Sequence, residues 1–278
     1  MKWPLSMSLI SALLLASLAS ATEIYRHVDS HGNIGFSDQP RANAERVDIT
    51  PISNRYRFQV RRVHDGDTVI LGNGESVRLL NINAPEVESG VSVAEPQGQA
   101  ARDWLRQQIG NGPVWLRFDV ERRDKYDRRL AHVFLENDRH LNLELLQQGL
   151  ASLTIHPPNL LYADAMQQAE QQAKAAKIGI WNGQDYPLRQ AKSELPTSER
   201  RGWQRWRITV DSIRETRNDI WLMAGDNLSL RISKQNRHLF ADLNSYLGRQ
   251  LEVTGWLSRR GNEAFILVRH PSVITSSD

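Results

Sequence analysis

Residues 58–80 have the sequence FQVRRVHDGDTVILGNGESVRLL, and this stretch decides the fold. Its apolar and β-branched residues gather in three short segments, Phe58–Val63, Thr68–Leu71 and Ser76–Leu80, which is typical of strands. The sequence Gly72-Asn73-Gly74 separates the last two segments with residues that tight turns favour. The sequence therefore predicts a three-stranded meander.

The segments that follow complete a small barrel. They are a helix over Pro96–Ile109 ended by Gly110, strands over Val114–Val120 and Arg129–Leu135, a short helix capped by Asn142 and stopped at Gly149, and an Ala/Gln-rich helix over Asn159–Lys177. Three strands, a helix, two strands and a helix are the order of an OB-type barrel, whose face and loops commonly bind nucleic acid. We expect this domain to span residues 56–183, with Trp181 packed at its end.

A second barrel is expected after a linker. Residues 184–200 contain Pro187 and Pro196 with little apolar periodicity, which predicts the linker. The strands expected after it are Gln204–Ile213, Asp219–Ala224, Leu228–Ile232, Gln250–Leu257 and Glu263–Val268, with a helix over Gln235–Leu247. This order predicts a second OB-like barrel over residues 201–275. The predicted fold class is thus β-barrel with helices, of the α+β type.

The N-terminus has the features of a secretory signal peptide. Lys2 precedes an apolar run from Leu9 to Leu18 and then Ala19-Ser20-Ala21, so we expect cleavage after Ala21. The run is shorter than the ~20 apolar residues that cross a bilayer, which disfavours a membrane anchor. The mature protein is therefore expected to be secreted or periplasmic.

Residues 22–52 predict a small N-terminal β-hairpin module. Two short strands flank a turn at Gly32-Asn33. The stretch resembles a small domain of unknown function near the N-termini of secreted bacterial proteins, with Val28-Asp29 and Phe36-Ser37-Asp38 in its pattern. This resemblance implies a bacterial envelope setting, and it leaves open an envelope protein partner.

Composition narrows the chemistry. The chain has no cysteine, which excludes disulfides, thiolate catalysis and cysteine-bound metals. Its formal net charge is only +3, but local clusters of basic residues attract polyanions. The clusters are at Arg61-Arg62, Arg122–Arg129, Arg200–Arg207 and Arg259-Arg260. They indicate a polyanionic partner such as DNA or RNA, but each cluster alone is also typical of plain solvated surface.

Acids near the meander indicate a phosphodiesterase site. Hydrolysis of a phosphodiester needs an aligned water, a base and positive charge beside the phosphorus. Asp67 is the first choice as ligand of a hard metal ion, with the Asn83 amide oxygen and the Ala84 carbonyl oxygen as further ligands. Glu86, three residues past Asn83, is the candidate base.

Two arginines complete this arrangement. Arg78 and Arg128 can hold one phosphate from two sides, because guanidinium groups match its oxygens. Each residue alone also has a plainer explanation. Asp65 and Asp67 can form an Asx turn, and Arg78 a surface ion pair.

The ordered motifs resemble the staphylococcal nuclease, or thermonuclease, family from about Phe58 to Trp181. They are Asp65-Gly66-Asp67-Thr68-Val69, Val77-Arg78-Leu79-Leu80, Ala84-Pro85-Glu86, Asp124-Lys125-Tyr126-Asp127-Arg128, Gln148-Gly149-Leu150-Ala151 and Ile180-Trp181. The resemblance implies a Ca²⁺-dependent nuclease that cleaves the bond between phosphorus and the 5′ oxygen of DNA or RNA and leaves 3′-phosphates.

The same resemblance implies a role for each residue. Asp67 and the Ala84 carbonyl correspond to calcium ligands, Asp65 to a nearby outer acid, Glu86 to the general base, Arg78 and Arg128 to the phosphate-binding arginines, and Lys125 and Tyr126 to residues beside the substrate phosphate and sugar.

Three positions depart from the family pattern. Asn83 replaces the usual aspartate, which removes a negative charge and predicts calcium binding near ~10⁻⁴ to 10⁻³ M. His156 lies where the family has paired base-stacking tyrosines, and it either binds substrate in their place or is a surface loop histidine. Asp127 replaces a small residue and puts a negative charge beside Arg128, with no assigned effect.

The second unit is rich in tryptophan and arginine. These residues are Trp203, Trp206, Trp221 and Trp256, with Arg205, Arg207, Arg259 and Arg260. Such a mixture suits single-stranded nucleic acid, where bases stack and phosphates pair. A small barrel also needs aromatics for its core, and core packing is the favoured explanation.

The sequence therefore predicts a metal-dependent endonuclease acting on DNA or RNA. The alternative is a secreted nucleic-acid-binding protein with weak or lost catalysis, and a third is an envelope interaction protein organised around the N-terminal module. The variant Glu86→Gln separates the first two, since an enzyme would lose turnover and keep binding.

Overall fold

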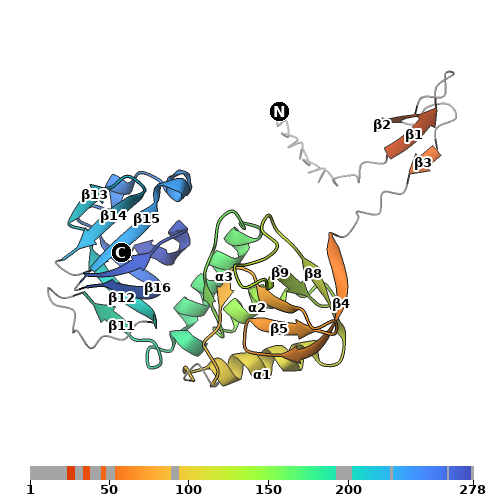
Figure 1. Ribbon diagram of the computed structural model, residues 1–278, viewed down its shortest axis with the longest axis horizontal. Coiled ribbons are helices and arrows are strands. Elements are labelled where there is room, and N and C mark those ends of the chain that lie inside the picture. The colour runs from red at the N-terminus through yellow and green to blue at the C-terminus, as the bar shows by residue number, and fades with distance from the viewer. Residues whose placement is uncertain are drawn as a thin grey trace, which may run out of the picture. The chain divides into compact units, whose positions relative to one another are not determined.

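A computed structural model describes residues 24–28, 34–37, 45–47, 54–88, 94–191, 202–225, 228–261 and 263–276. The chain divides into two compact units, Met1–Ser53 and Asn54–Asp278, and Figure 1 shows their elements. The predicted signal peptide, residues 1–21, lies outside the described residues.

The N-terminal unit contains a three-stranded sheet. Its strands are β1 (Ile24–Val28), β2 (Ile34–Ser37) and β3 (Glu45–Val47), in the order β2-β1-β3. The predicted hairpin is the antiparallel pair β1–β2, with Val28 opposite Ile34. Strand β3, which pairs with the other edge of β1, was not predicted, because three residues are too few to show an alternating pattern.

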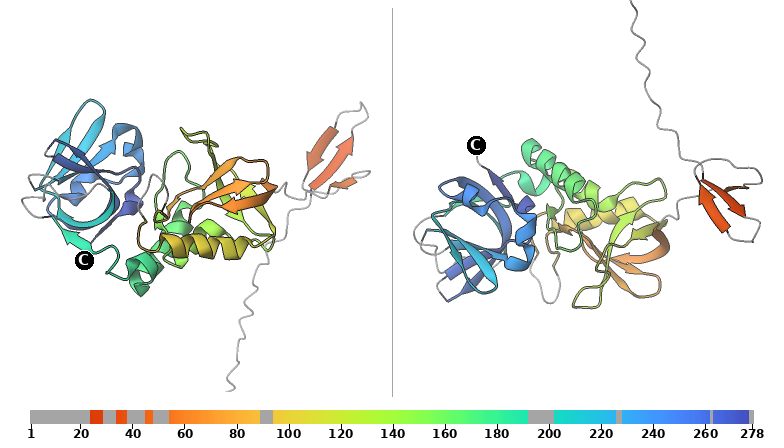
Figure 2. Two further views of the ribbon diagram at one scale, coloured as in Figure 1. Left: turned by 60° about the horizontal axis from the view of Figure 1, so that its bottom comes forward. Right: turned by 90° about the horizontal axis from the view of Figure 1, so that it is seen from above.

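The first barrel lies at the start of the second unit and consists of five strands. They are β4 (Arg55–Val63), β5 (Thr68–Leu71), β6 (Ser76–Leu79), β8 (Pro113–Arg117) and β9 (Arg129–Phe134), which close in the order β4-β5-β6-β9-β8. Figure 2 shows this part of the chain, coloured from orange to green, from two further sides. Only β6 and β9 pair in parallel. Alternate residues such as Val77 and Leu79 fill the core, which leaves Arg78 on the outer side of β6. The meander and the OB-type barrel predicted from the sequence are confirmed.

Helices and two very short strands cover this barrel. They are α1 (Gly98–Ile109), α2 (Leu141–Gln147), α3 (Ala163–Ala176), the 3₁₀ turn η1 (Gly179–Trp181), and the strand pair β7 (Ile82–Asn83) and β10 (Ser152–Leu153). One prediction was wrong here. Asn142 does not cap α2 but lies inside it, buried, where its side chain accepts from Val133 N and donates to Leu80 O.

The second barrel repeats the strand path of the first. Its strands are β12 (Gly202–Thr209), β13 (Ser212–Glu215), β14 (Asp219–Ala224), β15 (Leu228–Ser233), β16 (Gln250–Arg260) and β17 (Glu263–Leu267), in the order β12-β16-β17-β15-β14-β13. Among these strands β15 and β17 pair in parallel, as β6 and β9 do in the first barrel. Strands β12 and β13 stand at the two ends of this order although only Val210 and Asp211 separate them. This topology is that of an OB-like barrel whose first strand is broken at Val210-Asp211.

Other elements of this barrel differ from the predicted ones. The additional elements are β11 (Leu188–Gln190), η2 (Lys234–Leu239), η3 (Leu243–Tyr246), η4 (Pro271–Val273) and β18 (Ile274–Ser276). Strand β11 falls within the predicted linker and pairs in parallel with β12. The predicted helix over residues 235–247 is instead two 3₁₀ turns, because Asp242 caps a new turn by accepting from Asn244 N.

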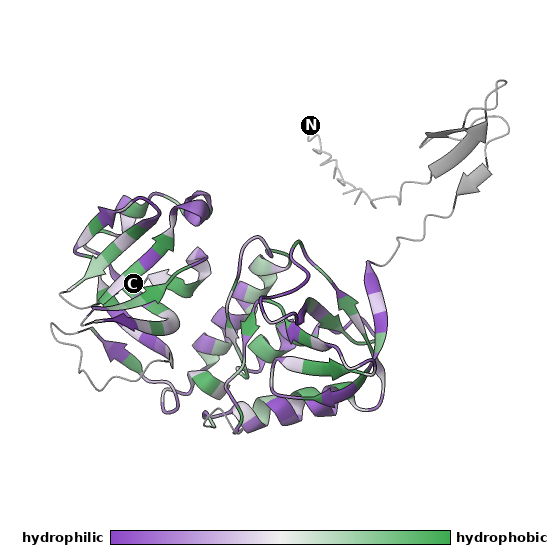
Figure 3. Cartoon of the chain, viewed as in Figure 1, coloured by the Kyte–Doolittle hydropathy of each residue, from purple (hydrophilic) through white to green (hydrophobic). Residues whose placement is uncertain are grey.

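An aromatic cluster joins the two barrels. Trp181 is buried and meets Trp203 at 5.7 Å between ring centroids. The Arg205 guanidinium lies 5.1 Å from the Trp181 ring. Figure 3 shows hydrophobic residues recurring along the strands of both barrels with hydrophilic residues between them. In the part of the chain that the structure describes, no helix combines the length and the apolar character that crossing a membrane requires.

Candidate active site

A tight turn between β4 and β5 holds two acids. The backbone N–H of Asp67 donates to Asp65 Oδ1 at 3.0 Å, so the Asx-type contact expected as the plainer alternative is present. Gly66 lies between them, and a Cβ there would be 2.6 Å from the Cβ atoms of both Ala84 and Ala101. The turn is therefore pressed against α1 and against the segment that follows β7. This packing fixes where Asp67 points.

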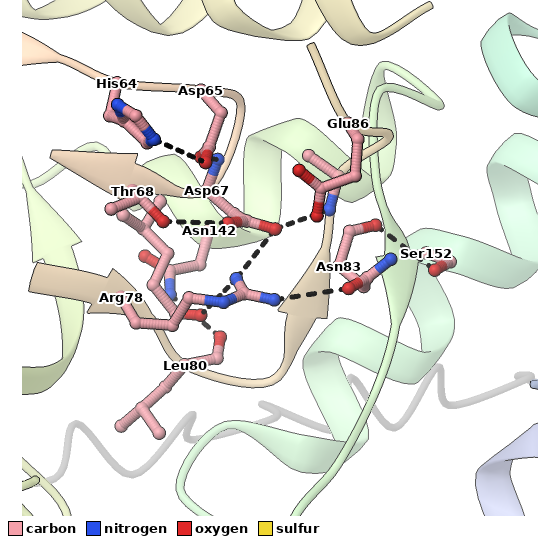
Figure 4. Close-up of polar contacts among 12 residues, drawn as sticks. His64, Asp65, Asp67, Thr68, Arg78, Leu80, Asn83, Glu86, Asn142 and Ser152 are labelled. Carbon is pink, nitrogen blue, oxygen red and sulfur yellow. Dashed lines mark hydrogen bonds and ion pairs between the residues drawn. The ribbon is translucent and has the colours of Figure 1, made fainter. Parts of the chain in front are cut away.

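Asp67 is the buried centre of the site. Its Oδ2 lies 2.7 Å from Nη1 of Arg78 and accepts the Ala84 N–H at 2.7 Å, while Thr68 Oγ1 donates to its Oδ1 at 3.1 Å, as Figure 4 shows. Burial raises the pKa of Asp67, the Asp65 charge adds to this effect, and Arg78 opposes it. A further positive charge at this place would stabilise the carboxylate.

Arg78 bridges Asp67 to Asn83. Its Nη2 donates to Asn83 Oδ1 at 3.3 Å. Strand pairing places Asn83 opposite Ser152, whose hydroxyl donates to the Asn83 carbonyl at 3.2 Å. The amide oxygen proposed as a metal ligand thus faces the site and accepts from a guanidinium. Ala84 meets Asp67 through its N–H, whereas the sequence indicated its carbonyl oxygen as the ligand.

Glu86 lies exposed at the edge of this cluster. Its N–H donates to Glu95 Oε2 at 3.0 Å, and the Glu95 N–H donates back to its carbonyl at 2.8 Å. Partial burial, then the charges of Asp65 and Glu95, raise the pKa of Glu86. A Cβ at Gly98 would lie 2.3 Å from the Glu86 carbonyl oxygen, so α1 begins directly against this peptide. The side chain can accept a proton from solvent while its backbone is held on two sides.

A loop before β9 carries the distant arginine. Asp124 Oδ2 lies 2.7 Å from Nε of Arg128, and its Oδ1 accepts the N–H groups of Tyr126 and Arg128. Although partial burial of Asp124 acts the other way, these bonds hold its pKa below the usual range. Parallel pairing sets Arg78 opposite Leu130, two residues after Arg128. Arg128 therefore lies in the loop directly before β9, the strand that pairs with the strand of Arg78.

The neighbouring predicted residues form the tip of the same loop. The Tyr126 ring is exposed, with Lys125 Nζ at 4.8 Å and the Arg128 guanidinium at 5.6 Å from its centroid. These three side chains could meet one substrate together. Within the described residues, no hydrogen bond joins this loop to Asp67.

Comparison with known proteins shows the family of the chain. Residues 76–183 match the family described as staphylococcal nuclease homologue. A thermonuclease of Staphylococcus intermedius is 37% identical over 127 residues, which cover 45% of this chain and 75% of that protein. Endonuclease YncB of Bacillus subtilis is 31% identical over 192 residues, which cover 64% of this chain and 90% of that protein. The chain belongs to the staphylococcal nuclease family.

The N-terminal unit also matches a family of its own. Residues 11–55 match a domain of unknown function, DUF4124. Both resemblances predicted from the sequence are therefore confirmed. A protein partner for this unit stays a prediction.

The staphylococcal nuclease pattern can now be compared with the departures seen in the sequence. Asp127, with φ of +63°, pairs with Arg123 rather than with its neighbour Arg128: its Oδ1 lies 3.1 Å from Arg123 Nη1. The extra negative charge at position 127 is thus matched locally. Arg128 keeps Asp124 as its partner.

His156 follows β10, and its surface is exposed to solvent. Its ring nevertheless has many protein atoms around it. This crowding first, then the positive charges of Arg269 and Arg78, lower the pKa of His156 to about 4. The imidazole is therefore neutral near pH 7 and lies within the electrostatic reach of Arg78. Its role in substrate binding stays a prediction.

Several residues around the site escaped the sequence interpretation. Glu95 and Ser152 fix Glu86 and Asn83, but a lone Glu before proline and a lone Ser carry no pattern that could have marked them. A groove of about 590 Å³ also adjoins the turn at His64. Its basic lining residues are Arg61, Arg62, Arg102 and Arg106. Only the Arg61-Arg62 cluster was noted in the sequence, because the other two come from α1.

Proposed function

We propose that this member of the staphylococcal nuclease family is a nuclease, an endonuclease that hydrolyses phosphodiester bonds of DNA or RNA with a divalent cation, Ca²⁺ first. The observation that carries the proposal is the buried Asp67 carboxylate, 2.7 Å from Arg78, with Glu86 exposed beside it. Basic residues of the adjoining groove support an extended polyanion as substrate.

The donor atoms of the site fit a hard cation. All candidates are oxygens: the carboxylates of Asp65 and Asp67, the Asn83 amide oxygen and the Ala84 carbonyl. Two of these four donors, the carboxylates of Asp65 and Asp67, carry charge, and the described residues contain no group of three or more His, Cys, Asp or Glu side chains that could hold a metal ion. Burial raises the pKa of Asp67 even though Arg78 opposes this effect, so a cation beside the carboxylate would stabilise its charged form further. Asp67, Asn83 and Ala84 would hold the ion, which supplies positive charge to a phosphate oxygen.

The protein's own residues account for the remaining requirements of the reaction. Arg78 and Arg128 hold the phosphate and stabilise the charge that grows on its oxygens. Glu86 accepts a proton from the attacking water, for which its raised pKa brings it closer to neutral pH. The family resemblance implies that the bond to the 5′ oxygen breaks, which leaves a 3′-phosphate.

Cleavage of a defined oligonucleotide tests the function. The mature protein is incubated with single-stranded DNA, single-stranded RNA or duplex DNA in Ca²⁺, Mg²⁺ or EDTA. We expect cleavage that requires the cation, with products that accept a 5′ label directly and a 3′ label only after phosphatase treatment. Absence of cation-dependent cleavage would overturn the proposal, and 5′-phosphate products would overturn the direction of cleavage.

A nucleic-acid-binding protein with weak catalysis is the second candidate. The observation that favours it is Arg78, which in this structure contacts both Asp67 and Asn83. A guanidinium in that position competes with a cation for the same oxygens. This candidate would be favoured if the protein binds DNA in EDTA and shows negligible turnover in about 10 mM Ca²⁺. That concentration is roughly ten times the dissociation constant of a weak extracellular calcium site.

We also propose a secreted or periplasmic location, based on the Leu9–Leu18 run and the Ala19-Ser20-Ala21 site. Mass spectrometry of the protein recovered from medium and from osmotic-shock fluid should show a chain beginning at Thr22. A full-length chain confined to the cell pellet would contradict this location.

A further inference from the structure

The outer face of the second barrel carries an aligned row of side chains. Strand register sets Arg214 opposite Trp221, Trp221 opposite Arg231, and Arg231 opposite Leu267. The row therefore crosses β13, β14, β15 and β17 without a break. On β14, β15 and β17 its members alternate with buried residues, such as Ile220 and Leu222 on β14, so they point away from the core, and Arg214 on β13 is exposed.

A second row runs beside the first. Met223 is opposite Ser229, and Ser229 is opposite Phe265. The rings of Trp221 and Phe265 meet across the two rows, with centroids 5.7 Å apart and planes at 73°. Neither ring is part of the barrel's hydrophobic core, which instead contains Trp206. Trp221 and Phe265 thus form a half-buried pair on the surface. We call these two residues, together with Arg214 and Arg231, the aromatic face.

Positive charge flanks the aromatic pair. The guanidinium groups of Arg214 and Arg231 lie 5.9 and 5.6 Å from the Trp221 ring. Arg231 also pairs with Asp219 at 2.9 Å, while the described residues contain no ion pair for Arg214. The nearby carboxylate of Glu215 is matched by Lys234 at 2.7 Å. The aromatic face therefore keeps a net positive charge.

We propose that the aromatic face binds single-stranded nucleic acid, with bases stacked on Trp221 and Phe265 and phosphates paired with Arg214 and Arg231. An OB-type barrel binds oligonucleotides on the face of its second and third strands, which here are β14 and β15. Aromatic rings accept any base, and arginines pair with the charged backbone. An apolar protein segment would gain nothing from the two guanidinium groups. The inference deepens the proposed function, because the second barrel then holds the strand that the first barrel cuts.

Binding is measured apart from cleavage. The full mature chain in EDTA is titrated with a fluorescent oligothymidylate and, separately, with a duplex of equal length. We expect Trp221→Ala to weaken oligothymidylate binding about tenfold, as loss of one stacked base does. Arg214→Gln should reduce the dependence of log affinity on log salt by about 0.7, the value for one phosphate of a single strand.

Matched variants keep the test decisive. Arg249→Gln removes the same charge from an exposed position outside the aromatic face and should leave binding unchanged. Trp221→Leu keeps apolar contact without a large ring, so it should bind as weakly as Trp221→Ala if the fold is intact. Equal affinity of both Trp221 variants and the parent, or equal binding of duplex and single strand, would overturn the inference.

The outcome is separable from that of the nuclease proposal. Cleavage of a small chromogenic phosphodiester, too short to reach the aromatic face, reports the first barrel alone and should be unaffected by Trp221→Leu. Oligothymidylate binding that depends on Trp221, with no cleavage of any substrate, would sink the nuclease proposal and keep this inference. Cleavage with unchanged binding in the Trp221 variants would do the reverse.

Discussion

The two barrels share a strand path, and each has an Asp–Arg ion pair at the corresponding position, but the surroundings of the two ion pairs differ. In each, an aspartate pairs with an arginine on the following strand: Asp67, just before β5, lies 2.7 Å from Arg78 of β6, and Asp219, the first residue of β14, lies 2.9 Å from Arg231 of β15. In the first pair the side chains are 8% and 18% exposed, and in the second 13% and 37%. The fold thus provides an ion pair twice, but only one of them lies deep in a cluster of polar groups.

Connecting segments make the difference. In the first barrel the chain after β7 returns to Asp67 through the Ala84 N–H, and helix α1 starts against Glu86. In the second barrel the carboxylate of Asp219 has Arg231 as its partner, while Asp219 N and O bond to Thr216 in the local turn. A barrel of this kind is therefore a scaffold, and its function depends on what the loops add.

The largest difference between the two barrels is expected at Glu86, which belongs to the first barrel. We expect Glu86→Gln to lower the turnover of single-stranded DNA about 10²- to 10⁴-fold, because the amide cannot accept the proton of the attacking water. Binding in EDTA should stay within about twofold, since a side chain at this exposed position contributes little to folding. Asp219→Asn is the control in the second barrel, and its turnover should match that of the parent. Equal loss in the two variants would show that the barrels do not differ in the way argued.

Acid should separate the barrels by stability. The first barrel buries His132 and His140, whose ring nitrogens Nδ1 and Nε2 lie 3.1 Å apart. Burial first, then neighbouring charge, lowers the pKa of His132 to about 2 and that of His140 to about 3. The unfolded chain binds protons below its ordinary histidine pKa near ~6.5, whereas the folded barrel stays neutral there, so stability present above that pH is lost as pH falls.

The loss for the first barrel should be about 2 to 4 kcal/mol between pH 7 and pH 5. Urea titrations at both pH values, read out by a short deuterium pulse and peptide mass spectrometry, follow β9 and β15 separately. Strand β9 should unfold at lower urea at pH 5, and His140→Gln should remove part of that shift. A shift of the same size in β15, or none in β9, would refute the assignment to these histidines.

Long, periodic segments could be predicted from the sequence, and short ones could not. Helix α1, with 12 residues, shows its buried positions Ala101, Leu105 and Ile109 at helical spacing, and the structure confirmed it. Strands β7 and β11 have two or three residues, and they exist because a neighbouring strand offers free backbone groups. The predicted helix over residues 235–247 failed since its periodicity spans two separate 3₁₀ turns.

The site shows the same division. Motif order predicted Asp67, Arg78 and Glu86 as site residues, and the structure brings Asp67 and Arg78 into contact with Glu86 near them. Side-chain partners from remote segments, such as Glu95, could not be found, since a single residue has no period. The position of the Arg78 guanidinium between Asp67 and Asn83 is likewise a three-dimensional fact.

The close packing of Gly66 against Ala84 and Ala101 should affect both the stability of the first barrel and its activity. A methyl group at Gly66 would lie 2.6 Å from two Cβ atoms, so Gly66→Ala should destabilise the first barrel by about 1 to 3 kcal/mol and lower activity by displacing Ala84. Gly72→Ala is the control in the same barrel, because the nearest atom to its Cβ is 3.5 Å away. Gly255→Ala crowds Ile266 in the second barrel and should destabilise that barrel with turnover retained. Chemical denaturation and initial rates measure both effects, and full activity in Gly66→Ala would contradict the proposed packing.

The smallest expected effect concerns the missing charge at Asn83. Asn83 Oδ1 accepts a hydrogen bond from Arg78 Nη2 at 3.3 Å. Asn83→Asp would put a carboxylate oxygen at this position. A second charged ligand beside Asp67 should lower the calcium concentration for half-maximal activity about tenfold, because affinity of such sites follows the number of charged ligands. Asn137→Asp adds the same charge at an exposed turn and should leave the calcium titration unchanged. Identical titrations for Asn83→Asp and the parent would mean that Asn83 does not face the cation, and the first barrel would then hold its ion through Asp67 and backbone oxygen alone.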